Sequence, residues 1–236
     1  GTQEFQLSSR EQSLIRWQAG TYGFLQDNPV KQGTYFGADA EMLGAPFPFF
    51  TSINTNSGKA YGYAVYGQAA YHLVPKLELV AGLRFDQEFK ELDIRGEFQP
   101  DGGDLIVTQP DTSSKADFTA FTPKVSLSYA FNERQNAFAS YSRGFRAGGI
   151  SQLSSDPSQP ALYNYDPEFS DNFEIGLKNT FLNKRLRLNL AAFYTRVNNA
   201  QVPTLILPEA ITIIRNAGKL TSKGAELELS ATLLKG

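Results

Sequence analysis

The sequence offers few side chains with catalytic chemistry. It contains no cysteine and a single histidine, His72, so a serine–histidine–aspartate triad would depend on that one side chain. His72 precedes Pro75 beside an expected turn, where we expect an ordinary surface or interfacial histidine. Glu226 and Glu228 could serve acid–base or metal chemistry, but we expect them on a polar wall instead. No glycine-rich phosphate loop is found, and we expect no catalytic residues, metal site or cofactor.

In several segments, charged or polar side chains stand at every second position between apolar ones. From Leu77 to Phe89, most odd-numbered positions hold leucine, alanine or phenylalanine, and most even-numbered positions hold charged residues. Because successive side chains of a strand point to opposite faces, one face is apolar and the other charged. The pattern recurs at 121–131, 173–181, 186–194 and 225–233, whereas for 136–147 the two faces stay undecided. The charged face is expected to carry Arg84, Asp86, Glu88, Lys90, Lys124, Lys178 and Arg187.

The alternation predicts an all-β chain, an antiparallel meander of about nine long strands. We place them at residues 2–9, 14–26, 60–73, 76–95, 117–131, 136–147, 168–182, 186–206 and 211–234. Short and long connections alternate along the chain, and the long ones are expected at 27–59, 96–116 and 148–167. The last connection, near 208–210, breaks the alternation because it is short where a long one would be due. Tight turns on one side and long loops on the other are typical of outer-membrane barrels, with the long loops outside the cell.

Composition narrows the classes of function. The 236 residues carry a net charge of −2, which gives no basic footprint for nucleic acid. No run of about 18 apolar residues is present, so no transmembrane helix is expected. Mean hydropathy is −0.31, which a membrane barrel can also show because its strands alternate. No signal peptide is visible, so we expect the chain to be part of a longer exported protein.

Two features favour a membrane barrel over a soluble β-sandwich. The alternation outlasts the five or six residues usual in globular strands, whereas a tilted bilayer crossing needs about 9–11. Aromatic residues also gather near the expected strand ends, as in the girdles at membrane–water interfaces. They are Tyr71, Phe89, Phe118, Phe121, Tyr129, Phe131, Phe181 and Tyr194. Spanning strands must have their backbone groups paired, so nine strands with two free edges would need further strands to close.

Several segments resemble the barrel strands of TonB-dependent receptors. They are AGLRFD at 81–86, FTPKVSLSY at 121–129, ASYSRGFRAGG at 139–149, PE at 167–168 with NFEIGLK at 172–178, NLAAFY at 189–194, and NAG at 216–218 with GAELEL at 224–229. They follow one another in the family's order across roughly residues 60–234, and residues 1–26 fit more loosely. The family's plug domain, TonB box and aromatic-ended last strand are not recognised in the sequence.

The resemblance implies a segment of a 22-stranded barrel in the outer membrane of a Gram-negative bacterium. It further implies a plug domain in the lumen and uptake of scarce ligands such as iron–siderophore complexes, vitamin B12 or some glycans. Energy would come from the proton gradient through a TonB–ExbB–ExbD complex, and the expected partners are outer-membrane lipid, the plug and a small ligand, with no nucleic acid. Another outer-membrane barrel, such as a passive porin or an adhesin, is the alternative, followed by a soluble β-sandwich binding module and, last, an enzyme.

Two groups of residues are candidates for ligand contact. Arg143 and Arg146 stand near an expected extracellular strand end and could attract an anionic ligand. Phe47, Phe49 and Phe50 could form an aromatic contact, although a loop that packs on itself is the more ordinary interpretation. The identity of the ligand does not follow from the sequence.

Overall fold

A nine-stranded antiparallel sheet dominates the chain. The computed structural model describes residues 1–43, 45, 47–152, 162–183, 185–206 and 211–232. In order across the sheet the strands are β1 (Thr2–Ser8), β2 (Ile15–Phe36), β3 (Phe50–Val74), β4 (Leu77–Pro100), β5 (Ile106–Asn132), β6 (Gln135–Arg146), β9 (Glu168–Phe181), β10 (Leu186–Asn198) and β13 (Lys219–Ala231). The expectation of an all-β antiparallel meander is confirmed.

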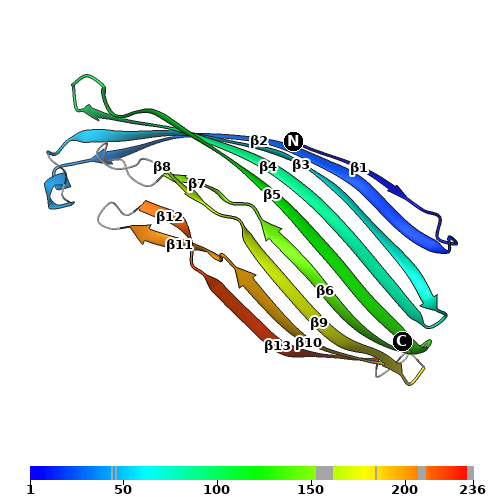
Figure 1. Ribbon diagram of the computed structural model, residues 1–236. Coiled ribbons are helices and arrows are strands. Elements are labelled where there is room, and N and C mark those ends of the chain that lie inside the picture. The colour runs from blue at the N-terminus through cyan, green and yellow to red at the C-terminus, as the bar shows by residue number, and fades with distance from the viewer. Residues whose placement is uncertain (44, 46, 153–161, 184, 207–210, 233–236) are drawn as a thin grey trace.

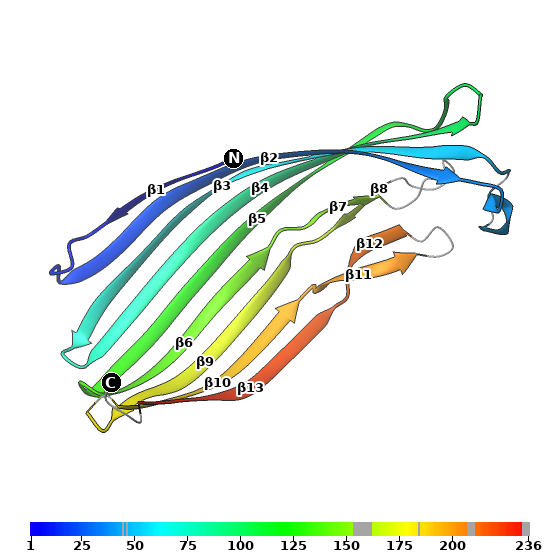
Figure 2. The same ribbon diagram turned by 180° about the vertical axis from the view of Figure 1, so that it is seen from behind.

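Two small hairpins and one short 3₁₀ helix accompany the sheet. The hairpins are β7 (Gly149–Gln152) with β8 (Leu162–Tyr165), and β11 (Gln201–Ile206) with β12 (Ile211–Asn216); the helix η1 spans Ala40–Leu43. The sheet is curled and both hairpins lie at the end opposite its tight turns (Figures 1 and 2). In the described part of the chain, no helix has the length and apolarity needed to cross a membrane.

Strand register sorts the side chains into an apolar face and a polar face. Leu79 stands opposite Leu127 and Phe85 opposite Phe121, so apolar residues of β4 and β5 share one side. Tyr141 of β6 pairs with Val125 and Phe173, which assigns the undecided strand as well. We call this side the apolar face and the opposite side the polar face.

Nothing among the described residues covers the apolar face. Leu83 is 52% exposed, Phe121 58% and Ile175 63%, values that a packed soluble core would not show. The buried apolar residues of the described chain are Ala40, Phe50, Ala64, Ile94, Phe118, Ala120, Ala200 and Ile213. The sheet therefore has no second layer here, which argues against a soluble β-sandwich.

The expectation that residues 27–59 and 96–116 form loops is wrong over most of both ranges. β2 and β3 stay paired up to Phe36 and Phe50, and β4 and β5 run on to Pro100 and from Ile106. The expected strands ended where apolar alternation stopped. Backbone pairing does not need an apolar face once water is available on both sides, so polar residues continue the ladder.

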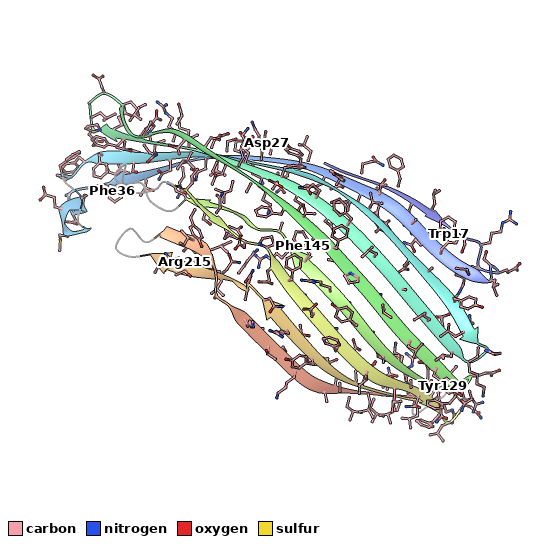
Figure 3. All side chains as sticks on the ribbon, viewed as in Figure 1. Trp17, Asp27, Phe36, Tyr129, Phe145 and Arg215 are labelled. Carbon is pink, nitrogen blue, oxygen red and sulfur yellow. The ribbon has the colours of Figure 1, made fainter. Side chains whose placement is uncertain are left out.

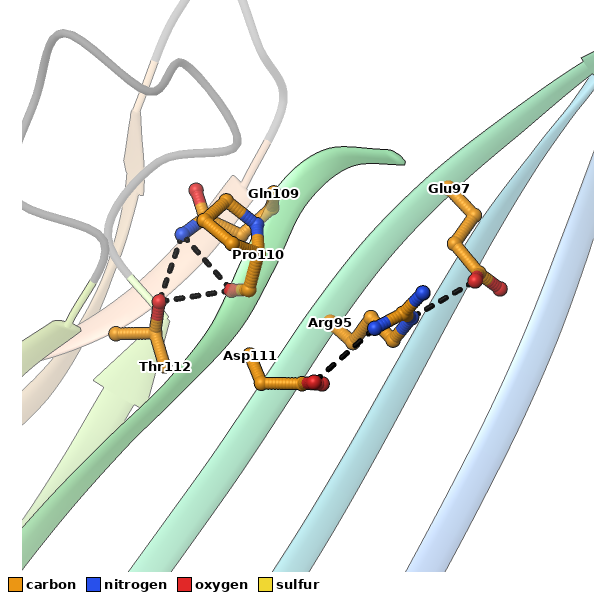
Figure 4. A network of polar contacts seen from close by, with 6 residues as sticks. All are labelled: Arg95, Glu97, Gln109, Pro110, Asp111 and Thr112. Atoms are coloured by element: carbon orange, nitrogen blue, oxygen red, sulfur yellow. Dashed lines mark hydrogen bonds and ion pairs between the residues drawn. The ribbon is translucent and has the colours of Figure 1, made fainter. Parts of the chain in front are cut away.

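An irregularity marks the far ends of β4 and β5. The register shifts between Ile94 and Glu97, next to Pro110, whose missing N–H cannot join a ladder. Figure 4 shows the side chains that hold this bulge. Gln109 Nε2 donates to Thr112 Oγ1 at 2.8 Å, and the Thr112 hydroxyl donates to the Pro110 carbonyl at 2.9 Å. The bulge thus keeps its polar groups largely paired.

Three further expectations change at the same end of the sheet. The strands expected at 186–206 and 211–234 are each split, because Asn199 (φ +54°) and Gly218 (φ +79°) adopt the left-handed region and redirect the chain. The expected loop 148–167 contains β7 and β8, while residues 153–161 lie outside the described chain. Phe118, expected in an aromatic girdle, lies on the polar face and is 9% exposed.

Candidate functional site

The polar face carries a cationic cluster where the hairpins meet the sheet. Lys90 of β4 donates from Nζ to the Gly148 carbonyl at 2.7 Å and lies 3.9 Å from Glu88 Oε2. Its ammonium also stands 5.8 Å from the centre of the Phe118 ring. A hollow of about 420 Å³ opens beside Lys90 and Tyr165. A fixed ammonium next to an aromatic ring and an open hollow could hold an anionic or aromatic group.

Close packing fixes the hairpin against this cluster. A Cβ at Gly148 would lie 2.3 Å from the Tyr165 carbonyl oxygen and 2.4 Å from the Phe118 ring, so only glycine fits. Burial raises the pKa of the Tyr165 phenol, and the positive charge of Arg146 opposes that rise. Tyr165 therefore remains a neutral hydroxyl near neutral pH and is available as a hydrogen-bond donor.

The two candidate arginines lie on opposite faces of β6. Arg146 belongs to the polar face and is exposed near Lys90 and Tyr165, where its charge acts on both groups. Arg143 shares the apolar face with Tyr141, and its guanidinium stacks 4.6 Å from the centre of the Phe169 ring. Residues an odd number of positions apart in a strand lie on opposite faces, so the two arginines named as candidate contacts for an anionic ligand do not lie together on one face.

The candidate phenylalanines pack mainly on one another. Phe50 stacks on Phe36 at 4.7 Å, and Phe47 lies 5.3 Å from Phe50 and 5.2 Å from Phe98 between ring centres. Phe50 is 8% exposed, so this aromatic cluster is a small core that joins the ends of β2, β3 and β4. Phe49 has φ +61° and is 48% exposed, which leaves it available at the surface.

A second polar network lies deeper on the polar face. Arg84 donates from Nε to Asp86 Oδ1 at 2.9 Å and lies between the rings of Tyr22 and Tyr66, at 5.7 and 5.8 Å. Tyr66 donates to Glu4 Oε1 at 2.5 Å. Arg84 and Asp86 were expected on this face, whereas the two tyrosines and Glu4 were not. Which residues of β1, β2 and β3 lie side by side depends on the strand register, which the sequence alone does not reveal.

The other charged residues expected on this face are there too. Lys124 lines a hollow of about 380 Å³ together with Arg84, whereas Lys178 and Arg187 line one of about 500 Å³ at the tight-turn end. Lys178 stands 5.2 Å from the centre of the Phe138 ring. Cations are therefore spread over the whole height of the polar face.

One buried glutamine, which was not among the expected site residues, connects the hairpins to the sheet. Gln201 donates from Nε2 to the carbonyls of Ala147 at 2.9 Å and Asp166 at 3.1 Å. Its backbone N–H donates to Glu168 Oε2 at 2.6 Å. These bonds join β11, β9 and the segment after β6 into one unit. No local sequence signal marks such a residue, since its partners are distant backbone carbonyls.

Catalytic and metal chemistry find little support in the described residues. His72 is half exposed, with Nε2 at 3.5 Å from Glu78 Oε2, and Arg16 pairs with the same carboxylate. This is a surface ion-pair network of the expected ordinary kind. The described part of the chain contains no group of three or more histidine, cysteine, aspartate or glutamate side chains placed to hold a metal ion.

Comparison with known proteins agrees with this architecture. Residues 2–235 match the family described as TonB dependent receptor-like, beta-barrel. The ferric-pyoverdine BN7/BN8 receptor of Pseudomonas putida is 26% identical over all of this chain, which covers 28% of that receptor. The metal-pseudopaline receptor CntO of Pseudomonas aeruginosa is 25% identical over 81% of this chain and 25% of its own length. The chain thus spans about a quarter of these curated relatives.

Solved structures show the same fold at lower identity. The ferric yersiniabactin uptake receptor FyuA of Yersinia pestis superposes with a TM-score of 0.75 at 17% identity, covering 100% of this chain and 33% of that one. The siderophore receptor PiuA of Acinetobacter baumannii gives 0.67 at 19%, covering 99% and 36%. With the family match over nearly its whole length, the chain belongs to the TonB-dependent receptor β-barrel family.

Proposed function

We propose that this chain forms part of the barrel wall of an outer-membrane receptor that takes up metal-carrying siderophores in a Gram-negative bacterium. The apolar face would contact lipid, and the polar face would line the lumen and contact a plug domain. The single observation that carries the proposal is the uncovered apolar face, which continues across the nine-stranded sheet. The names of the two curated relatives supply the class of ligand.

The open sheet edges fit a portion of a larger barrel. Among the described strands, β1 and β13 each have a neighbour on one side only. A lipid-exposed edge would leave backbone N–H and C=O groups unsatisfied, so further strands must complete the wall. In this proposal the long, polar ends of β2–β5 project outside the cell, and the tight turns face the periplasm.

Energy coupling separates this proposal from the alternatives. We expect a strain lacking the complete gene to lose uptake of a ferric siderophore that the wild type imports, screened with radioactive iron on a panel that includes pyoverdine. Collapse of the proton gradient with a protonophore should abolish that uptake in the wild type, as energy transfer through TonB–ExbB–ExbD requires. Uptake that persists without the gradient would indicate a passive porin, and no uptake of any tested compound would favour an adhesin.

Within this receptor, the Lys90, Arg146 and Tyr165 cluster is the proposed contact for an anionic ligand. Arg146→Ala in the complete receptor should weaken binding of the imported siderophore about tenfold, since a charge-assisted hydrogen bond is lost. Arg187→Ala is the matched control, because it removes an arginine from the same face at the opposite end. Equal affinity of the Arg146 variant and the wild type, measured by fluorescence quenching, would remove Arg146 from the site.

A further inference from the structure

The apolar face carries a charged cluster that no lumen function explains. Arg143, Asp171 and Arg196 stand opposite one another on β6, β9 and β10. Two residues further toward the tight turns, Tyr141, Phe173 and Tyr194 form the next row of the same face. Since side chains repeat with a period of two, both rows project to the side proposed to meet lipid. The charges therefore lie just beyond an aromatic row, which on the proposed membrane face would place them at the level of lipid head groups.

A groove runs down the apolar face directly below this cluster. It has a volume of about 570 Å³ and is lined mostly by apolar side chains of β5, β6, β9 and β10. Ala139 and Ala192 flank Ile175 in the register, so small side chains form its floor while Tyr141 and Tyr194 stand at its upper end. A furrow of this composition suits an extended hydrocarbon chain.

The cluster carries more positive than negative charge. Arg143 Nε lies 4.0 Å from Asp171 Oδ1, too far for a hydrogen bond, and it is buried without an acceptor among the described residues. Asp171 Oδ1 already accepts the Tyr141 hydroxyl at 2.8 Å. Arg196 is exposed and stands opposite Asp171 in the register, so this row of the face holds two guanidinium groups and one carboxylate. Guanidinium donors match the geometry of phosphate oxygens.

We propose that Arg143 and Arg196 bind the anionic, phosphate-bearing head group of a membrane lipid whose acyl chain occupies the groove below. Charge complementarity and the continuity of groove and cluster argue for a lipid over a protein partner, because one amphiphile satisfies both parts. The inference rests on the proposed membrane location of this face. It assigns a role to Arg143 that differs from the ligand contact expected from the sequence.

Native mass spectrometry of the complete receptor in detergent tests the site. The probes are phosphatidylglycerol, net-neutral phosphatidylcholine and inorganic phosphate. The double variant Arg143→Gln with Arg196→Gln should bind phosphatidylglycerol about tenfold more weakly than the wild type, because charge-assisted bonds to phosphate are lost. Lys115→Gln is the control, since Lys115 lies on the same face and pairs with Glu91 at 3.0 Å. Equal loss in both variants, or none in either, would overturn the proposal.

Two further arms separate the lipid from a free anion and from misfolding. Ala139→Trp should fill the groove and weaken phosphatidylglycerol binding with both arginines intact. Inorganic phosphate that displaces the lipid at equal concentration would contradict a lipid site. The double variant Arg143→Lys with Arg196→Lys keeps both positive charges, so it should bind phosphatidylglycerol more tightly than the double glutamine variant. A wild type that inserts and imports, yet binds lipid no better than the glutamine variant, defeats this inference alone, whereas failed insertion of the wild type defeats the proposed function.

Discussion

The two faces of the sheet differ in the chemistry of their exposed side chains. Leu83 and Leu127 are large apolar residues at 52% and 40% exposure, an arrangement that water would disfavour and lipid would not. Arg84 and Lys124 alternate with them and lie on the polar face. This residue-scale contrast could be predicted from period-two spacing alone, and register confirms it.

A charge placed on the apolar face should block membrane assembly. Leu83→Arg or Leu127→Arg in the complete receptor should cost about 2–4 kcal/mol near the bilayer midplane and deplete the heat-modifiable folded band on gels. Lys124→Ser, on the polar face, should assemble like the wild type. Equal insertion of the three variants would contradict the assignment of faces.

A close aromatic–glycine contact makes a second test at this scale. A Cβ at Gly176 would lie 2.5 Å from the Phe138 ring and 2.8 Å from the Leu190 carbonyl oxygen, so a larger residue must displace its neighbours. Gly176→Val should lower the free energy of unfolding by about 1–3 kcal/mol in urea titrations of the bilayer-embedded receptor. Gly58→Val is the control, because nothing lies within 4 Å of its Cβ position. If Gly176→Val lowers the free energy of unfolding no more than Gly58→Val does, the Phe138 ring can move aside without cost, which would contradict this prediction.

Arg143 lies in the one strand whose faces the sequence left undecided. In residues 136–147, odd-numbered and even-numbered positions both carry polar and aromatic side chains. The sequence therefore does not reveal which set of positions in β6 belongs to the apolar face. Only pairing of Tyr141 with Val125 and Phe173 fixes the strand, and with it the face of Arg143. Residues that depend on the phase of a mixed strand need their neighbours' register before a role can be assigned.

At the scale of elements, the strands divide into a part with apolar alternation, which is proposed to cross the membrane, and polar extensions beyond it. Aromatic side chains occur toward the tight-turn end, as at Trp17 and Tyr129, while Phe36 lies at the far tip of β2 (Figure 3). Beyond the apolar alternation, ion pairs such as Arg95 with Asp111 at 3.0 Å and Glu97 at 2.7 Å replace it (Figure 4). The nine strands of the main sheet and their order could be predicted, whereas the four hairpin strands and these extensions could not. The extensions escape prediction because a strand exposed to water on both faces shows no apolar alternation.

The hairpins form a second element-scale unit that depends on Gln201. Gln201→Ala would leave the Ala147 carbonyl without its donor, at a local cost of about 1–3 kcal/mol, while the Asp166 carbonyl would keep the bond from Asn216 Nδ2 at 2.9 Å. Hydrogen exchange in the complete receptor should then speed up in β7 and in β11–β12 while the β3–β4 ladder is unchanged. Thr204→Ala, which removes only a 3.4 Å contact to the Val202 carbonyl, should change nothing. Unaltered exchange in the Gln201 variant would mean that packing around Ile213 holds the hairpins without it.

At the scale of the whole molecule, the chain is a curled sheet with an exposed apolar face and a polar face (Figures 1 and 2). The family match over residues 2–235 and the fold shared with siderophore receptors place it within TonB-dependent barrels. The uncovered apolar face and the open edges both follow from membership of a larger barrel, whose remaining strands would pair β1 and β13.

The most direct test places single cysteines from Leu79 to Phe89 in a cysteine-free background, a change that this cysteine-free chain permits. Spin labels at these sites in the bilayer-embedded receptor report collisions with oxygen, which concentrates in lipid, and with a water-soluble nickel complex. We expect oxygen collisions to peak at the odd-numbered positions, including Leu79, Leu83 and Phe85, with a period of two. Oxygen peaks at the even-numbered positions, or equal access of the nickel complex throughout, would contradict a lipid-facing sheet.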